Sequence, residues 1–325
     1  MEQRALAGRP VSVVGLGSWQ LGGDWGTVGE DDALALIDAA VGAGVTFIDT
    51  ADVYGDGRSE RLIGRWLAAH RDTGVMVATK MGRRVEQTVE NYSPDAMRVW
   101  NDRSRQNLGV DTLDLVQLHC PPTALYSVDG VFDDLDSMVA EGRMRAYGVS
   151  VETCDEALAA IARPHVASVQ IILNALRLKP LEQVLPAAYD AGVAIIARVP
   201  LASGLLSGRY DETTTFGADD HRTYNRHGEA FDVGETFSGV PFDLGLEAVR
   251  ALSAAVPEGA TTAQFALRWI LDQPGVTTVI PGARNREQAL ANASAAALVP
   301  LTAESLETVR SVYDSVVRDA VHARW

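Results

Sequence analysis

The sequence predicts an α/β fold, a (β/α)8 barrel, in a single domain that spans residues 1–325. Short apolar, β-branched runs alternate with longer segments of helical period, and this alternation indicates parallel strands joined by crossover helices. Eight such pairs follow one another along the chain, which is the number that closes a barrel. A chain of 325 residues, 47% of them hydrophobic, is also long enough to bury the core of one large barrel.

The expected strands, in chain order, are Val13–Leu16, Thr46–Asp49, Val75–Thr79, Leu113–Leu118, Ala146–Ser150, Ser168–Ile171, Ala194–Val199 and Thr277–Ile280. The expected helices are Glu30–Val41, Ser59–Ala69, Ser93–Leu108, Val128–Glu141, Thr153–Ile161, Leu181–Asp190, Thr262–Gln273 and Arg286–Ala297. Glycine-containing segments at 41–45, 108–110, 191–193 and 273–276 are typical of helix C-caps that lead into a strand. These boundaries support the alternating pattern.

Three further segments lie outside the eightfold pattern. Residues 1–12 predict a β-hairpin that closes the bottom of the barrel, although Gly8 and Pro10 weaken the pattern. Helical periods at Leu244–Ala255 and Ala303–Val317 predict two accessory helices. Leu201–Pro241 shows no clear period over roughly 40 residues, and a loop of that length inside a barrel is usually functional. We interpret it as a lid.

Composition excludes several classes of function. A formal net charge of −15 argues against nucleic-acid binding, which normally needs a basic surface. The N-terminus has no signal-peptide pattern, and no apolar run is long enough to span a bilayer, so we expect a cytoplasmic protein without a membrane partner. Cys120 and Cys154 form no metal-ligand spacing, so we expect no disulfide framework and no metal site. A monomer or a weak homo-oligomer is expected.

Ionisable residues stand at the ends of neighbouring predicted strands. Asp49 ends the second strand and Tyr54 follows in its loop, whereas Lys80 ends the third strand and His119 follows the fourth. Active sites of such barrels lie at the C-terminal mouth, so these four side chains are expected to face one cavity. Each alone has an ordinary explanation, as a turn cap or a structural histidine, but together they favour an active site. Asp52 is expected to be a turn or helix-side residue.

The chemistry of these four groups is mutually supportive. Asp49 and Lys80 would each be costly to bury alone, but side by side they neutralise one another. An adjacent ammonium favours the phenolate and therefore makes Tyr54 a better proton donor. His119 would orient a carbonyl or share the proton.

The motifs "GLGSWQLGG", "FIDTADVYG", "RSERLIG", "ATKMG", "LDLVQLHC", "YGVS", "PLASGLLSG" and "IPGARNREQ" resemble those of the aldo-keto reductase superfamily. The resemblance covers almost the whole chain, and the catalytic tetrad of that superfamily matches Asp49, Tyr54, Lys80 and His119. It implies metal-free, reversible hydride transfer between a nicotinamide cofactor and a small-molecule carbonyl substrate. Tyr54 would be the general acid or base, with its pKa lowered by Lys80 paired to Asp49, and His119 would position the carbonyl.

The cofactor is expected on the loops that follow the seventh and eighth strands. No glycine fingerprint with a distant acidic partner follows the first strand, which argues against a Rossmann site. Barrel enzymes instead hold phosphate on the last two loops, and small residues in Pro200–Gly208 would let the backbone approach a pyrophosphate. The resemblance implies cofactor contacts from Gly17, Ser18, Trp19, Ser150, Gln170, Arg198, Pro200, Leu201, Ser203, Gly204, Leu205, Gly208, Gly282, Arg284, Gln288 and Asn292, with Asn174 as a further candidate.

The expected cofactor is NADP (NADPH) rather than NAD, because Arg284 can face a 2′-phosphate. The chain departs from the superfamily pattern at several positions. Arg198 stands where an aromatic residue commonly stacks on the nicotinamide, and Val151 stands where many members have asparagine. Gly282 and Ala283 replace a lysine and a serine, which weakens the preference for NADP.

The sequence does not decide the substrate, and it leaves two rival functions open. The aromatic residues and proline that would line a substrate pocket are Trp19, Trp25, Pro121, Tyr224, Phe231 and Phe237. The lid cations His221, Arg222, Arg226 and His227 indicate either an anionic ligand or ion pairs with nearby acidic residues. One rival is a Schiff-base aldolase or isomerase that uses Lys80 as its amine. The other is a cofactor-binding regulatory subunit with little turnover.

Overall fold

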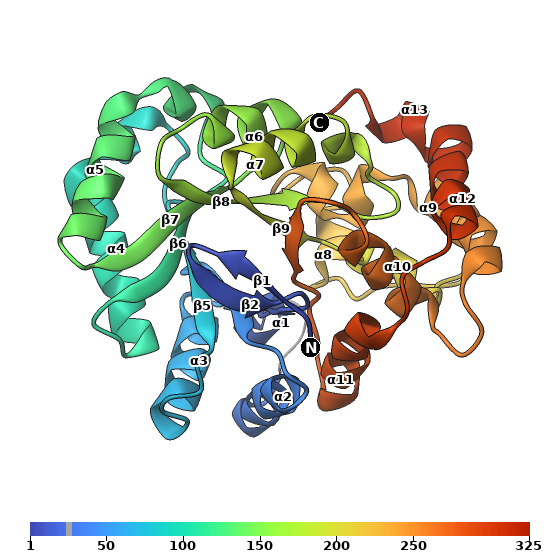
Figure 1. The fold of residues 1–325 in the computed structure, drawn as a ribbon, viewed down its shortest axis with the longest axis horizontal. Helices are drawn as coiled ribbons and strands as arrows, with labels where there is room; N and C mark the ends of the chain where they lie inside the picture. The colour runs from blue at the N-terminus through green and yellow to red at the C-terminus, as the bar shows by residue number, and fades with distance from the viewer. Residues whose placement is uncertain (24–27) are drawn as a thin grey trace.

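The computed structural model describes residues 1–23 and 28–325, and its centre is a parallel sheet whose neighbours follow chain order. The eight strands are β3 (Leu16–Gly17), β4 (Phe47–Asp49), β5 (Met76–Met81), β6 (Leu113–His119), β7 (Met144–Ser150), β8 (Val166–Ile172), β9 (Ala194–Arg198) and β10 (Val276–Val279). Parallel bridges Val14–Val279 and Gly17–Gly282 join the first strand to the last. The sheet therefore closes as the predicted α/β barrel, with helices around its outside (Figure 1).

The helices between these strands are α1 (Trp19–Gly22), α2 (Glu30–Gly42), α3 (Arg58–Ala69), α4 (Pro94–Leu108), α5 (Asp129–Ala140), α6 (Cys154–Ile161), α7 (Val184–Ala191), α8 (His221–Tyr224), α9 (Phe242–Leu252) and α10 (Thr262–Leu271), and α11 (Arg286–Ser294), α12 (Ala303–Val312) and α13 (Arg318–Val321) follow β10. Local sequence explains their ends. The Thr153 and Thr261 side chains form capping boxes at the starts of α6 and α10. Left-handed Gly109 and Gly192 end α4 and α7.

Two predicted boundaries differ from the structure for local reasons. Residues 13–15 form hydrogen bonds with Val279 of β10, whereas Leu16 and Gly17 pair with β4, so the regular first strand is shorter than expected. Helix α7 begins at Val184 rather than at Leu181. Pro186 lacks an N–H and is tolerated only in the first turn of a helix, which excludes the earlier start.

The amino-terminal end of the barrel is filled by a small hairpin. Strands β1 (Gln3–Leu6) and β2 (Arg9–Ser12) pair antiparallel, and both residues of the turn between them, Ala7 and Gly8, have positive φ. Leu6 and Val11 of the hairpin belong to one buried cluster with side chains of the barrel strands, namely Phe47, Met76, Ala78, Leu115, Ala194, Ile196 and Ile280. Because this end is packed with apolar side chains, a site for polar chemistry is left to the opposite end.

The long segment from Leu201 to Pro241 is folded, although it contains only short helices. It begins with the 3-10 turn Ala202–Ser207, includes α8, and ends with 3-10 turns at Val233–Glu235 and Phe237–Gly239. The rings of Phe216 and Phe237 pack against Phe242 at the start of α9, with centroids 6.0 and 5.1 Å away. In the part of the chain that the structure describes, no helix is both long and apolar enough to cross a membrane.

Candidate active site

A buried ion pair lies at the carboxyl ends of β4 and β5. The Lys80 Nζ atom is 2.5 Å from Asp49 Oδ2, and it also donates to the Thr50 carbonyl at 2.9 Å and to the Tyr54 hydroxyl at 3.2 Å. Both charged side chains are at most 3% exposed. Burial alone would lower the pKa of Lys80, but the Asp49 carboxylate holds it above its usual value, so the amine stays protonated.

Two buried glutamines complete the surroundings of Asp49. The Asp49 Oδ1 atom accepts hydrogen bonds from Gln170 Nε2 at 2.8 Å and from Gln117 Nε2 at 3.3 Å. Gln117 lies opposite Lys80 in the register of β5 and β6. Sequence reasoning did not select Gln117, although a lone amide inside the apolar run "LVQLHC" was a usable signal. Both carboxylate oxygens of Asp49 therefore have partners within the protein.

Tyr54 is held against the ion pair by a tight loop. Gly55 has φ +57°, and a Cβ atom there would lie 2.0 Å from the Gly22 carbonyl oxygen, so only glycine fits this approach. The Tyr54 ring meets His119 edge-on, with ring centroids 6.1 Å apart. Trp19 stacks on the Tyr54 ring, with ring centroids 6.2 Å apart. The loop thus holds the phenol close to both the ammonium and the imidazole.

The net shift of the Tyr54 pKa is opposite to the sequence-based expectation. Burial raises the pKa of the phenol, and this effect exceeds the lowering by the adjacent Lys80 ammonium. The expected effect of Lys80 is present, but the cost of burying a phenolate is larger. Tyr54 therefore carries its proton in this structure.

His119 is a neutral ring in this setting. Burial, followed by the charges of Arg83 and Lys80, holds the pKa of His119 well below its usual value. Arg83 Nη1 lies 3.5 Å from His119 Nε2, and a guanidinium only donates, so this contact uses Nε2 as acceptor and leaves the ring proton on Nδ1. His119 Nδ1 is buried and has no partner among the residues that the structure describes.

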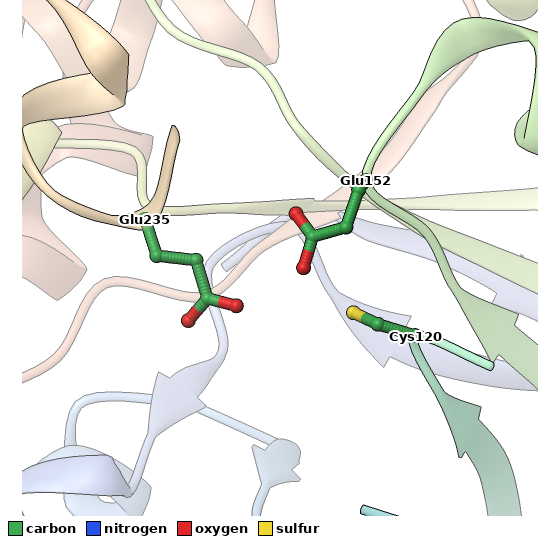
Figure 2. A group of neighbouring side chains, drawn as sticks. All are labelled: Cys120, Glu152 and Glu235. Atoms are coloured by element: carbon green, nitrogen blue, oxygen red, sulfur yellow. The ribbon is translucent and has the colours of Figure 1, made fainter. Parts of the chain in front are cut away.

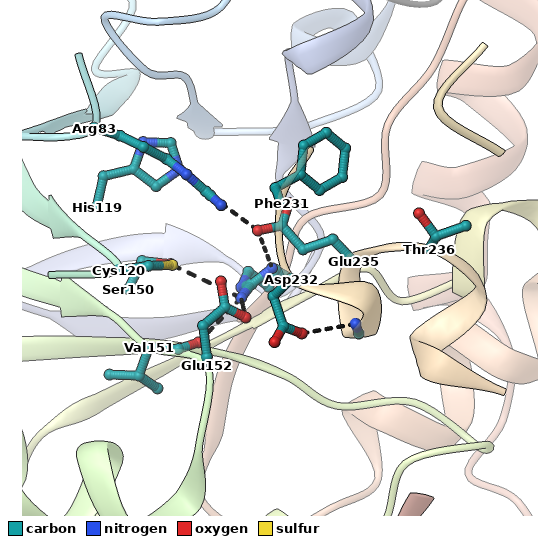
Figure 3. Close-up of polar contacts among 12 residues, drawn as sticks. Arg83, His119, Cys120, Ser150, Val151, Glu152, Phe231, Asp232, Glu235 and Thr236 are labelled. Atoms are coloured by element: carbon teal, nitrogen blue, oxygen red, sulfur yellow. Dashed lines mark hydrogen bonds and ion pairs between the residues drawn. The ribbon is translucent and has the colours of Figure 1, made fainter. Parts of the chain in front are cut away.

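Arg83, Glu152 and Glu235 lie beside His119 (Figure 3), and Arg198 joins them through ion pairs with Glu152 and Glu235, so the four residues form a charged cluster. Arg198 Nη2 is bonded to Glu152 Oε2 at 2.8 Å and to the Val151 carbonyl at 3.0 Å. The guanidinium at the position where the superfamily commonly has a stacking aromatic residue is thus bound by two residues that follow β7. Sequence reasoning did not select Arg83, Glu152 or Glu235. The only signal was their position, because two follow strand ends and the third lies in the lid.

A cavity of about 480 Å³ extends from Tyr54 to the loops after β9 and β10. It is lined by most of the predicted site residues: Gly17, Ser18, Trp19, Asp49, Tyr54, Gln170, Arg198, Pro200, Leu201, Ser203, Gly204, Gly282, Arg284, Gln288 and Asn292. Lys80 and His119 are buried beside Tyr54 but are not part of this lining. The cavity joins the tetrad to the loops expected to hold a cofactor.

Other predicted residues lie away from the cavity lining. Ser150 is buried beside Cys120, Leu205 packs near Gly245, and Gly208 ends the 3-10 turn in a left-handed conformation. Asn174 bonds to Val199, Ser238 and Leu176, so its amide has partners within the protein. Trp25 lies outside the described residues. Of the other expected pocket residues, Phe231 packs on Trp19 and Tyr224, while Pro121 and Phe237 are buried.

The far end of the cavity is positively charged. Arg209, Arg222 and Arg284 line it together with Ser203 and Gly204, which both have positive φ. Arg222 is paired with Asp220, as the salt-bridge interpretation of the lid cations expected. Exposed backbone and cationic side chains together suit a phosphate group.

These features fit an elongated anionic dinucleotide. The cavity volume lies in the range of cofactor sites. Gln20 also lines the cavity, and its buried Oε1 atom has no partner among the residues of the described part of the chain. A ligand donor would satisfy this orphaned acceptor.

Comparisons with known proteins agree with this arrangement. The aldo-keto reductase YhdN of Bacillus subtilis is 30% identical over 333 residues, covering 99% of this chain and 96% of that protein. The structure of the glycerol dehydrogenase AKR11B4 from Gluconobacter oxydans matches with a TM-score of 0.78 at 29% identity, covering 97% of this chain and 96% of the other. The holo form of the aldo-keto reductase AKR11C1 from Bacillus halodurans matches with a TM-score of 0.77 at 26% identity, covering 96% of both chains.

The family model described as "Aldo/keto reductase family" matches residues 13–314. This range contains all eight barrel strands and the whole tetrad. Because the match spans nearly the whole chain, and a relative of 30% identity aligns over almost all of it, the chain belongs to the aldo/keto reductase family of oxidoreductases.

Proposed function

We propose that this protein reduces an aldehyde or ketone with NADPH by reversible hydride transfer, and that Tyr54 is the general acid in reduction and the base in oxidation. The observation that carries the proposal is the position of the Tyr54 hydroxyl, which is 3.2 Å from Lys80 Nζ and at the wall of the 480 Å³ cavity. A proton donor at a strand end beside a large cavity is the arrangement that carbonyl reduction needs.

The other members of the tetrad support Tyr54. Lys80 donates to the phenol oxygen and stabilises negative charge that develops there as the proton leaves. Asp49 balances the Lys80 charge and fixes the position of the amine. His119 is neutral, so it polarises a carbonyl as a hydrogen-bond donor without competing for the proton of Tyr54. In that role its Nε2 must carry the ring proton, which requires Arg83 to release it when substrate binds.

The nicotinamide cofactor supplies the hydride when it is bound. Ser203, Gly204, Gln288 and Asn292 line the cavity; the first two would hold the pyrophosphate with their backbone, and the last two would contact the adenosine. Arg284 lines the cavity next to these residues, and its fixed charge favours the 2′-phosphate of NADP over NAD. Gln170 lines the opposite end, beside Asp49 and Tyr54, where the nicotinamide amide would lie.

The Schiff-base alternative is disfavoured by the state of Lys80. Its Nζ atom is bonded to Asp49, Thr50 and Tyr54, and its pKa is raised, so the amine is not a free nucleophile. A regulatory role would not require the complete tetrad that the chain carries. For the substrate we propose a small polar carbonyl compound, a class consistent with the similarity to a protein described as a glycerol dehydrogenase.

The substitution Tyr54→Phe tests the proposal. It removes the proton donor without changing the ring, so we expect reduction of a carbonyl panel, followed by loss of NADPH absorbance, to fall by about 100- to 10,000-fold. NADPH affinity, measured by fluorescence titration, should stay near that of the wild type. Tyr189→Phe on α7 is the matched control, because Tyr189 is 75% exposed and away from the cavity. Wild-type turnover in Tyr54→Phe would remove Tyr54 from the mechanism.

A further inference from the structure

The four side chains of the charged cluster connect the lid to three strand ends, and cations alternate with carboxylates along the chain of contacts. Arg83 follows β5, Glu235 comes from the lid, Arg198 ends β9, and Glu152 follows β7. Arg83 Nη1 is 2.9 Å from Glu235 Oε1, which is 3.7 Å from Arg198 Nη1. Arg198 Nη2 is in turn 2.8 Å from Glu152 Oε2. Two cations and two carboxylates give the cluster a formal charge of zero.

The cluster borders the place where chemistry is proposed. Glu235 and Arg198 line the cavity together with Tyr54, and Arg83 contacts the imidazole of His119. A substrate whose carbonyl reaches Tyr54 and His119 therefore has its neighbouring atoms beside Glu235 and Arg198. No residue of the cluster belongs to the tetrad.

The two carboxyl groups differ because they face different numbers of cations. Burial would raise the pKa of Glu235, but Arg83 and Arg198 together hold it below its usual value. Burial raises the pKa of Glu152 to about 7, because Arg198 and Arg83 oppose this rise whereas the neighbouring carboxylates of Glu235 and Asp232 add to it. Glu235 is thus a fixed acceptor at the cavity wall, whereas Glu152 can carry a proton.

Two polar atoms of the cluster are buried without a partner among the described residues. One is Arg198 Nε, a donor on a side chain that is only 9% exposed, and the other is Glu152 Oε1, an acceptor. Leaving such atoms unpaired is costly. A hydroxyl group both donates and accepts, so it can serve either kind of atom, whereas an alkyl group serves neither.

We propose that Glu235 and Arg198 are specificity-determining residues that select carbonyl substrates bearing a hydroxyl group close to the carbonyl. The inference rests on the proposed carbonyl reduction and adds a substrate class to it. A neutral hydroxyl enters the cluster without breaking an ion pair. A carboxylate would have to displace Glu235 or Glu152 from an arginine, so the intact cluster disfavours keto acids.

The same residues also form a candidate group of metal ligands. Ligand atoms of Cys120, Glu152 and Glu235 lie within 4.8 Å of one another (Figure 2). However, both carboxylates already face arginines, and Arg198 Nη2 lies 3.9 Å from Cys120 Sγ. A metal cation placed there would be repelled by these guanidinium groups, so we favour hydroxyl recognition.

The experiment compares 2-hydroxypropanal with propanal, which differ by one hydroxyl group, using the full chain and NADPH. We expect the wild type to show a kcat/KM for 2-hydroxypropanal at least roughly tenfold above that for propanal, the range of a hydrogen bond to a charged group. Glu235→Gln and Glu152→Gln should each reduce this ratio several-fold. Glu212→Gln is the matched control, because Glu212 is a lid residue whose ion pair with Arg250 is exposed. It should keep the wild-type ratio.

A third substrate, pyruvate, distinguishes recognition from general damage. Glu235→Gln leaves Arg83 and Arg198 with one carboxylate between them, so we expect kcat/KM for pyruvate relative to propanal to rise in this variant. Three results would each overturn the inference. The wild type could show equal kcat/KM for the two aldehydes or prefer pyruvate, or the ratio of kcat/KM for 2-hydroxypropanal to that for propanal could be unchanged in both variants. Those results leave the proposed carbonyl reduction intact, because that proposal fails only if the wild type oxidises no NADPH with any compound of the carbonyl panel. Thermal unfolding confirms that each variant is folded.

Discussion

Asp52 is the most unusual carboxyl group outside the tetrad, two residues before Tyr54 in the same loop. Its side chain is fully buried, and neither carboxyl oxygen has a partner among the residues with described positions. Burial, and then repulsion from Glu60, raises the pKa of Asp52 to about 7. Asp52 is therefore protonated in the folded protein at mildly acidic pH, while it is ionised in the unfolded chain.

This difference predicts how stability depends on pH. The pKa of Asp52 is 3.8 in the unfolded chain and about 7 in the folded protein, so between these pH values the folded protein binds one more proton than the unfolded chain. The free energy of unfolding that Asp52 contributes is therefore lost as pH rises through this window. Asp52→Asn removes the titrating group. The free energy of unfolding of the variant, relative to that of the wild type, should rise by up to roughly 4 kcal/mol between pH 4 and pH 7. Above pH 7 this difference should stay constant.

Denaturant unfolding of both proteins at several pH values measures this gain. Subtracting the wild-type curve cancels the titration of all other groups. Glu60→Gln is not a suitable control, because Glu60 is buried and bonded to Thr79 and Asn107. Asp190→Asn, at an exposed position on α7, is the matched control. A difference that does not change with pH would show that Asp52 is ionised when folded.

At the scale of elements, α3 and α4 cross at a glycine. A Cβ atom on Gly64 of α3 would lie 2.6 Å from the Asn107 carbonyl oxygen and 2.8 Å from the Leu108 backbone on α4. Glu60, one turn earlier on α3, bonds to the Asn107 side chain and to Thr79 of β5. This close approach fixes the helix that follows the Tyr54 loop against its neighbour and the barrel.

The contact reverses the usual effect of replacing a helical glycine. Alanine normally stabilises a helix interior relative to glycine by about 0.5–1 kcal/mol. Gly64→Ala should instead lower the free energy of unfolding by about 1–3 kcal/mol, because backbone atoms of α4 must move. Gly130→Ala on α5 is the matched control, since no atom lies within 4 Å of the added methyl group. It should be neutral or stabilising in the same denaturant titration, and equal effects of both substitutions would contradict the tight crossing.

At the scale of the whole molecule, the barrel closes where the cavity lies. Hydrogen bonds from Gly15, Gly17 and Val279 join the first and last strand regions. Gly17–Gln20 on one side and Ile280–Arg284 on the other both line the cavity. A ligand in the cavity therefore contacts both sides of the junction and stabilises the closed barrel.

We expect NADPH to slow hydrogen exchange of the Gly17 and Val279 amides. If these amides exchange by opening of the ligand-free junction, exchange should slow by up to roughly 100-fold at an NADPH concentration of 100 times Kd. NADH at the same concentration should protect them less, because it lacks the phosphate that Arg284 would bind. Amides of β6 such as Leu115 and Val116 serve as internal controls, since they do not line the cavity. Equal protection by both nucleotides would contradict the proposed preference for NADP.

The sequence by itself determined the barrel and the meeting of the tetrad. Strand and helix periods are local, and parallel strands that follow chain order bring their carboxyl ends together, so Asp49, Tyr54, Lys80 and His119 had to converge. Motif resemblance added the expectation that the loops after β9 and β10 hold the cofactor. The exact ends of the helices were less predictable, as the start of α7 two residues before Pro186 shows.

Tertiary structure alone decided which charges pair and how far each side chain is from water. Glu235 meets Arg83 across 152 positions of the chain, through a lid with no periodic pattern, so no local rule predicts the pair. Burial likewise set the pKa of Tyr54 above its usual value, where the sequence had suggested the opposite. The physical reason is that electrostatic free energies depend on distance and desolvation, which only the folded chain defines.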